Sequence, residues 1–202
     1  LCEWAGKCGG CLYQTLPYEK QLAIKEAQIK KMLDNGGTDY TFEGIVSSPV
    51  VSGYRNKVEL TFGDSYMGGP LALGMHQRGS FYDIVNTPQC HIVHEDFRKI
   101  LTATLEYFTE KGMGYYRKLQ HEGYLRHLLV RRAVKTGEIL VALVTSGQTG
   151  AAGMPESLEA EKVLLEEWKE TLLALKMEGG FAGILHIRND TLADVVQSDE
   201  TT

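Results

Sequence analysis

Apolar side chains recur at helical spacing in three segments of the chain. The first segment reads TLPYEKQLAIKEAQIKKMLDNGG, in which Pro17 is placed for a first helical turn and a glycine pair follows the last turn. Because side chains three and four positions apart share one face of a helix, each segment predicts an amphipathic helix. We expect helices at residues 17–35, 95–111 and 156–177. Their apolar stripes include Tyr18, Leu22, Ile29 and Leu33 in the first, Phe97, Ile100, Leu101 and Phe108 in the second, and Leu158, Leu165, Trp168 and Leu172 in the third.

Alternating apolar and polar positions predict strands between these helices. In YRNKVELTFG, residues 54–63, the apolar side chains of Val58, Leu60 and Phe62 alternate with other residues, which is typical of a half-buried strand. The segment GYLRHLLVRRAVKTGEILVALVT predicts a long hairpin that turns at KTGE. The pattern therefore predicts an α+β or mixed α/β domain with a largely antiparallel sheet and flanking helices. Further strands are expected at residues 71–77, 81–85, 181–190 and 192–197.

Composition places the chain among globular proteins of one or two domains. It has 202 residues, of which 43% are hydrophobic and 9% aromatic, enough to bury a core. No apolar run approaches the roughly 20 residues that cross a bilayer, and no signal peptide opens the chain. We therefore expect a cytoplasmic protein with no membrane partner. Since the sequence starts without methionine and stops in a polar run after an apolar one, we expect a piece of a longer protein.

The charges are distributed unevenly along the chain. The net charge is −5, yet residues 54–135 carry 12 basic and 8 acidic side chains, whereas residues 136–202 carry 4 basic and 12 acidic ones. The middle of the chain is therefore at +4 and the end at −8. Such asymmetry is compatible with a surface that faces a polyanion, and equally with ordinary solvated faces.

Four cysteines are the main candidates for site chemistry. Cys2, Cys8 and Cys11 lie together in CEWAGKCGGCLYQ, and Cys90 stands alone in NTPQCHI. Structural zinc sites usually take two ligands from each of two short knuckles. A cubane iron–sulfur cluster, which also takes four thiolates, often combines three from one loop with a distant fourth. The spacing favours an iron–sulfur cluster, while zinc and metal-free thiols or disulfides stay open.

Longer stretches of the sequence carry a resemblance to a known family. The stretches CGGCLYQTLPYEKQLAIKEAQI, GYRNKVELTFG, LGMHQRGSFYDIVNTPQCHI and HLLVRRAVKTGEILVALVT follow one another through nearly the whole chain. They resemble the RNA (uracil-5-)-methyltransferase family, in its iron–sulfur-containing branch that modifies ribosomal RNA. The resemblance implies a cytoplasmic, S-adenosylmethionine-dependent enzyme of three parts: an N-terminal RNA-binding barrel, a central α/β domain with a [4Fe–4S] cluster, and a C-terminal Rossmann-like methyltransferase domain.

The resemblance also implies roles for parts of this chain. Residues 1–13 and 46–202 would form the central iron–sulfur and RNA-binding domain, and residues 14–45 a helical segment that packs on the absent C-terminal domain. The family's nucleophilic cysteine and its S-adenosylmethionine site lie in that C-terminal domain, so we expect no catalytic and no cofactor-binding residue of that kind here. Branches without the cysteines modify transfer RNA, so ribosomal RNA is favoured over transfer RNA as the partner. By this resemblance the cluster ligands are Cys2, Cys8, Cys11 and Cys90.

Basic side chains on the predicted strands are candidates for RNA contacts. Arg55 and Lys57 lie on the polar face of the strand at residues 54–63, and the resemblance favours Arg55 most. Arg131 and Arg132 lie on the hairpin, where alternation sends them to opposite faces. Phosphate contacts of this kind position RNA without reading its sequence. The alternative interpretation is that these are solvated strand faces.

A second class of function fits the same cysteines. A non-catalytic adaptor, with a four-cysteine site for zinc or an iron–sulfur cluster, would contact RNA or protein without performing chemistry. Sequence beyond Thr202 separates the two classes, because only a methyltransferase continues into a catalytic core.

Overall fold

Three helices and seven strands form the described part of the chain. The structure is a computed structural model that describes residues 2–192 and 200–202. Its helices are α1 (Tyr18–Asn35), α2 (Glu95–Glu110) and α3 (Leu158–Leu173). Its strands are β1 (Lys57–Gly63), β2 (Ala72–His76), β3 (Ile84–Asn86), β4 (Leu125–Arg132), β5 (Glu138–Thr145), β6 (Gly180–Arg188) and β7 (Glu200–Thr201). The three predicted helices are confirmed.

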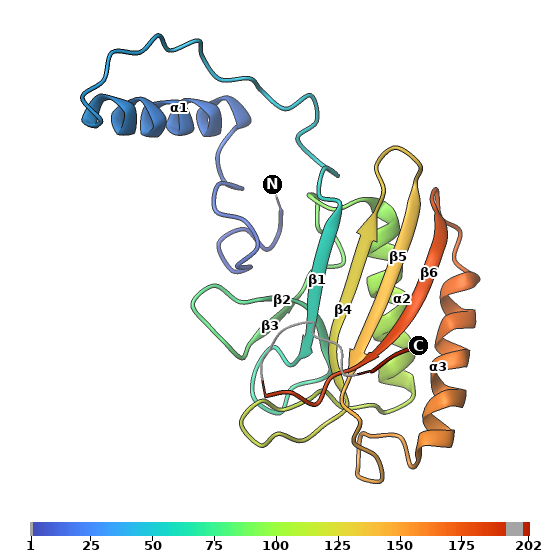
Figure 1. Ribbon diagram of the computed structural model, residues 1–202. Helices are drawn as coiled ribbons and strands as arrows, with labels where there is room; N and C mark the ends of the chain where they lie inside the picture. The colour runs from blue at the N-terminus through green and yellow to red at the C-terminus, as the bar shows by residue number, and fades with distance from the viewer. Residues whose placement is uncertain (1, 193–199) are drawn as a thin grey trace.

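The strands form one mixed sheet in the order β3-β2-β1-β4-β5-β6-β7. Every neighbouring pair is antiparallel except β5 and β6, which are parallel because α3 connects them. The long hairpin of β4 and β5 lies at the centre of the sheet, as the alternation predicts. The prediction of a mixed α/β fold with a largely antiparallel sheet is confirmed (Figure 1).

The main core lies between the sheet and two helices, since α2 and α3 cover the same face (Figure 1). The apolar side chains of β1 point into this core, so the predicted alternation is confirmed. Phe108 of α2 lies between Phe62 and Trp168, with ring centroids 6.1 Å away in both cases. The indole Nε1 of Trp168 donates to Thr104 Oγ1 at 3.2 Å, so this buried polar atom is satisfied. The aromatic contacts fix α2 and α3 against the sheet.

Two strand predictions need correction. The strand predicted from residue 54 begins at Lys57, because the backbone of Arg55 pairs elsewhere: its N–H donates to the carbonyl oxygen of Ile92 at 2.8 Å. The strand predicted over residues 81–85 begins at Ile84. The strand predicted over residues 192–197 lies almost entirely outside the described residues.

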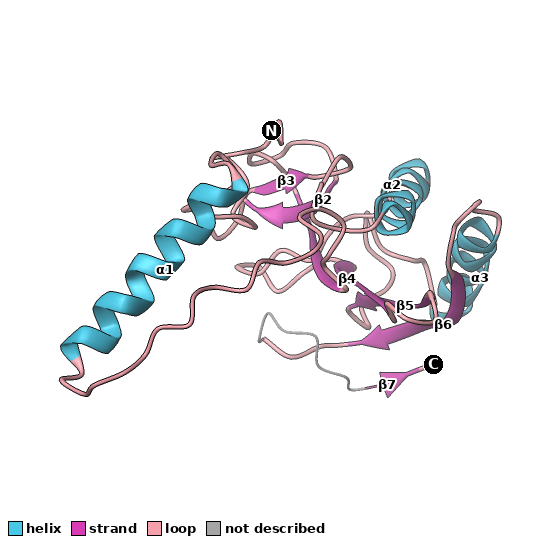
Figure 2. Ribbon diagram, turned by 90° about the horizontal axis from the view of Figure 1, so that it is seen from above, coloured by secondary structure: helices cyan, strands magenta, loops and turns pink. Residues whose placement is uncertain are grey.

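Helix α1 stands away from the sheet, and none of its residues is buried (Figures 1 and 2). Part of its predicted apolar stripe is exposed, including Ile29 and Leu33, with Met32 beside them. A long segment returns from α1 to β1, and the Ser48 N–H donates to the Tyr18 hydroxyl oxygen at 2.8 Å. None of the helices in residues 2–192 and 200–202 has the length and apolar character that crossing a membrane requires.

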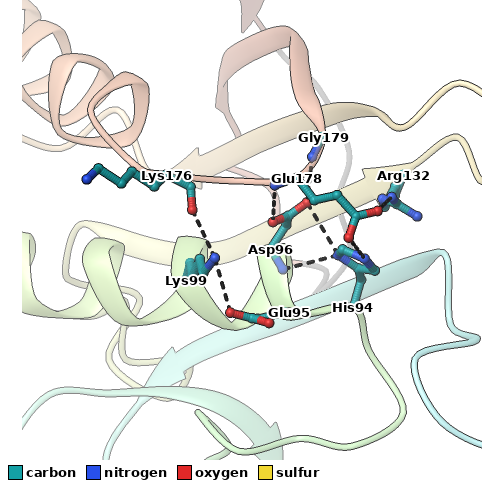
Figure 3. A network of polar contacts seen from close by, with 8 residues as sticks. All are labelled: His94, Glu95, Asp96, Lys99, Arg132, Lys176, Glu178 and Gly179. Carbon is teal, nitrogen blue, oxygen red and sulfur yellow. Dashed lines mark hydrogen bonds and ion pairs between the residues drawn. The ribbon is translucent and has the colours of Figure 1, made fainter.

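A buried carboxylate connects the start of α2 to the loop between α3 and β6 (Figure 3). Asp96 accepts hydrogen bonds from the backbone N–H groups of Glu178 at 3.0 Å and Gly179 at 2.9 Å. His94 Nδ1 caps the helix by accepting from the Asp96 N–H at 3.2 Å. Glu178 in turn forms an ion pair with Arg132 at 3.0 Å. The network draws Arg132 of β4 toward the helical side of the sheet.

Candidate cysteine cavity and basic groove

The N-terminal loop that carries three cysteines rests on the turn between β2 and β3 (Figure 2). The Gly9 N–H donates to the His76 carbonyl oxygen at 2.9 Å, and the Arg78 N–H donates to the Lys7 carbonyl oxygen at 2.8 Å. The Arg78 guanidinium adds a hydrogen bond from Nη2 to the Cys11 carbonyl oxygen at 2.6 Å. A Cβ at Gly9 would lie 2.9 Å from the His76 oxygen, so the close approach of the two segments requires glycine.

Cys90 comes to the same place from the loop after β3. A tight turn over Pro88 orients it, because the Cys90 N–H donates to the Thr87 carbonyl oxygen at 3.1 Å. The cysteines are unbonded to one another, partly buried, and line one cavity of about 30 Å³. Apolar side chains form much of the remaining wall, including Ala5, Met75 and Ile92. The structure thus brings together all four predicted ligands, namely Cys2, Cys8, Cys11 and Cys90.

The thiols influence one another's ionisation. Burial raises the pKa of Cys8, and the charges of Cys90 and Cys2 raise it further. The Gly10 N–H, which donates to the Cys8 Sγ at 3.3 Å, acts in the opposite direction and lowers the pKa. Burial likewise raises the pKa of Cys11, with further increases from Cys90 and Cys8. Neighbouring thiolate charges in this apolar cavity would repel each other, and a positively charged group among them would remove that repulsion.

Within residues 2–192 and 200–202, no group of three or more His, Cys, Asp or Glu side chains is arranged to hold a metal ion. The four cysteines nonetheless line the same cavity.

A basic groove of about 640 Å³ adjoins the cysteine cavity and shares Gly10 and Met75 with it. Three cationic side chains, Arg55, Lys57 and Arg78, line the basic groove, together with one carboxylate, Glu59. Sequence patterns predicted Arg55 and Lys57 but missed Arg78, which reads only as part of a turn in QRGS. Arg78 is recognised as part of the groove only in the folded structure, where the turn that carries it contacts the cysteine loop.

A second groove of about 330 Å³ continues from Lys57 across β4 and is lined by Arg131 and Arg132 of the hairpin. Arg131 is exposed and lies directly opposite Lys57 in the antiparallel register. Arg132 is partly buried and its charge is paired with Glu178. A further hairpin arginine, Arg126, is buried and donates to the Asn189 and Thr191 carbonyl oxygens at 2.5 and 2.9 Å, so its role is structural.

Comparisons with known proteins give a consistent result, although no family model matches. A protein of Clostridium acetobutylicum with the name uncharacterized RNA methyltransferase is 46% identical over 200 residues, covering 98% of this chain and 41% of the relative. A tRNA (uracil(54)-C(5))-methyltransferase of Pyrococcus horikoshii is 31% identical over 144 residues, covering 71% of this chain and 32% of the relative.

A solved structure shows the same fold. The tRNA (uracil-54, C5)-methyltransferase of Pyrococcus abyssi, in complex with S-adenosyl-L-homocysteine, aligns with a TM-score of 0.66 at 22% identity. The alignment covers 97% of this chain and 41% of that protein. The chain thus spans about two fifths of the length of the first relatives it matches.

Proposed function

We propose that this chain is the [4Fe–4S]-binding, RNA-recognising part of an S-adenosylmethionine-dependent RNA uracil-C5 methyltransferase. Relatives named RNA methyltransferase and tRNA uracil-C5 methyltransferase support the RNA uracil methyltransferase family. Their names give no support to a free-standing adaptor. Because the chain covers only 41% of the first relative, the activity of the whole enzyme is part of the proposal.

The cysteine cavity is the observation that carries the proposal. Four thiols from two distant segments line one apolar cavity, and the Gly10 N–H donates to the Cys8 sulfur at 3.3 Å. Thiolates are the usual ligands of iron–sulfur clusters, and amide hydrogen bonds to sulfur stabilise their negative charge. When bound, a cluster supplies either electron transfer or a rigid core that fixes four sulfurs. The ligands would be Cys2, Cys8, Cys11 and Cys90.

The methyl-transfer chemistry is assigned to sequence outside this chain. All four cysteines belong to the cavity, so none is left as the nucleophile that attacks the uracil ring. Helix α1 and its flanks, residues 14–45, would dock on the methyltransferase domain. The exposed side chains of Ile29, Met32 and Leu33 support this assignment, since an apolar stripe on an unpacked helix is stabilised by a partner.

RNA recognition is assigned to the two basic grooves. Arg55, Lys57 and Arg131 would contact phosphates, with Arg132 less available because of its ion pair with Glu178. Such contacts position RNA so that the catalytic domain can reach an unpaired or flipped uridine. We propose ribosomal RNA as the substrate, with transfer RNA as the alternative that the names of some relatives suggest.

Methyl transfer by the full-length protein tests this function. Radiolabelled S-adenosylmethionine is supplied with ribosomal and transfer RNA transcripts, and the product nucleoside is identified after digestion. We expect 5-methyluridine in the ribosomal transcript, and no transfer by the 202 residues alone. Labelling of transfer RNA only would change the substrate, and activity of the isolated chain would overturn the domain assignment.

A further inference from the structure

We infer that the cysteine cavity and the basic groove are thermodynamically coupled, so that RNA backbone bound in the groove and a group bound by the cysteines stabilise each other. The inference rests on the proposed function and adds a regulatory link to it. The cavity and the groove share part of their wall, because Gly10 and Met75 line both spaces. Any movement of the cysteine loop at Gly10 therefore changes both the cavity and the groove.

Arg78 connects the groove to the loop with three cysteines. Arg78 lines the groove, its guanidinium donates to the Cys11 carbonyl oxygen at 2.6 Å, and its backbone N–H donates to the Lys7 carbonyl oxygen at 2.8 Å. Cys8 also pairs with Gln77 in an isolated β-bridge. Hydrogen bonds and a β-bridge therefore join the turn between β2 and β3 to the cysteine loop.

Arg55 connects the groove to the fourth cysteine. The Arg55 N–H donates to the Ile92 carbonyl oxygen at 2.8 Å, and the Gly53 N–H donates to the His91 carbonyl oxygen at 2.8 Å. These two acceptors follow Cys90 directly in the chain. Each of the two groove arginines is therefore anchored beside a different part of the cysteine set.

Filling the cavity should fix the spacing of the two arginines. A group held by all four thiolates links the N-terminal loop to the loop of Cys90, and so holds Arg78 and Arg55 at one separation. An empty cavity leaves the cysteine loop attached chiefly through its backbone hydrogen bonds to the β2–β3 turn. Phosphate ligands bind arginine pairs best when the pair is preorganised, because less ordering entropy is lost on binding.

The groove chemistry favours a single-stranded RNA backbone as the ligand. Three cations and one carboxylate give the groove wall a net charge of +2, and Gly9, Gly10 and Gly79 leave its backbone accessible. An open groove with arginines suits a flexible phosphate chain, which arginine can contact with two hydrogen bonds at each phosphate. By linkage, the factor by which the cluster raises RNA affinity equals the factor by which RNA raises cluster affinity.

Two measurements on the anaerobically purified full-length protein test the coupling. The first compares the affinity of cluster-loaded and chelator-stripped protein for a single-stranded ribosomal RNA oligonucleotide at fixed salt. We expect stripping to weaken binding about tenfold, within the usual range of coupling between sites. The second follows loss of visible absorbance in chelator with and without the oligonucleotide, and we expect RNA to slow that loss.

Substitutions of Arg78 distinguish a coupling that depends on this side chain from a general effect of positive charge. Arg78→Ala should abolish RNA protection of the cluster, while Arg78→Lys, which keeps the charge, should retain RNA binding and lose part of the protection. Lys162→Ala, which removes an exposed cation on α3, is the matched control and should leave both measurements unchanged. Equal RNA affinity of loaded and stripped protein with an intact circular dichroism spectrum would overturn the coupling alone. Absence of iron from the purified protein would overturn the proposed cluster as well.

Discussion

Lys57 of β1 and Arg131 of β4 face each other as directly opposed residues in an antiparallel strand pair. Both side chains are exposed, and within the described residues neither forms an ion pair. Like charges at such a position repel each other, so the pair is unfavourable for the isolated fold. An anion bound between them would make the same arrangement favourable, which is a reason to place an RNA phosphate there.

Arg131→Ala should therefore weaken RNA binding without destabilising the protein. Removing the repulsion should raise the free energy of unfolding slightly, by about 0.2–1 kcal/mol, while the loss of one phosphate contact should flatten the salt dependence by about 0.7 units for a single strand. Urea unfolding and a salt series of binding isotherms measure the two effects. Lys135→Ala, in the exposed turn of the same hairpin, serves as the comparison, and an identical loss of affinity there would argue against a specific site.

Arg55→Ala tests the predicted contact in the basic groove. The backbone hydrogen bond to Ile92 survives this change, so folding stability should stay close to that of the unchanged protein. Affinity for a ribosomal RNA hairpin should fall, and the salt slope should decrease by about one unit. If the melting temperature drops while affinity and slope stay constant, Arg55 is a structural residue and the RNA surface lies elsewhere.

Asp96→Ala should destabilise the domain strongly. The change leaves the N–H groups of Glu178 and Gly179 without their buried acceptor and removes the carboxylate beside His94 (Figure 3). An unsatisfied buried donor costs about 1–3 kcal/mol, and because these two donors are only partly buried, water replaces part of the lost bonding, so we expect a loss of about 2–4 kcal/mol in urea unfolding. Asp39→Ala, in an exposed segment, should change stability by less than about 0.5 kcal/mol. Comparable effects of the two substitutions would show that the network contributes little.

Gly9→Ala should loosen the cysteine loop. The added Cβ would lie 2.9 Å from the His76 carbonyl oxygen, a backbone atom that cannot turn aside as a side chain can. The loop should then dock less closely on the β2–β3 turn, and a chelator should remove the bound group faster. Gly180→Ala is the control, because a Cβ there meets nothing within 4 Å. Equal chelation rates for the two variants would mean that the close approach at Gly9 is unimportant for the site.

The sequence predicted the helices and strands better than the contacts between segments that lie far apart in the chain. Alternation identified the buried face of β1 because one face of that strand packs on a core, and helical spacing located α1 although none of that helix's residues is buried. It could not place Arg78, whose importance depends on a contact with Cys11 across 67 positions. It also misjudged Arg55 as a strand residue, because periodicity carries no information about backbone pairing with residue 92.

The iron content of the full-length protein, purified without oxygen, shows whether the four cysteines hold an iron–sulfur cluster. Iron, acid-labile sulfide and zinc are quantified for the unchanged protein, for Cys90→Ser and for Gln89→Ser, an exposed neighbour that serves as control. We expect roughly four irons and four sulfides per chain in the unchanged protein and in Gln89→Ser, with a marked loss in Cys90→Ser. Stoichiometric zinc without iron, or full iron retention in Cys90→Ser, would contradict this expectation.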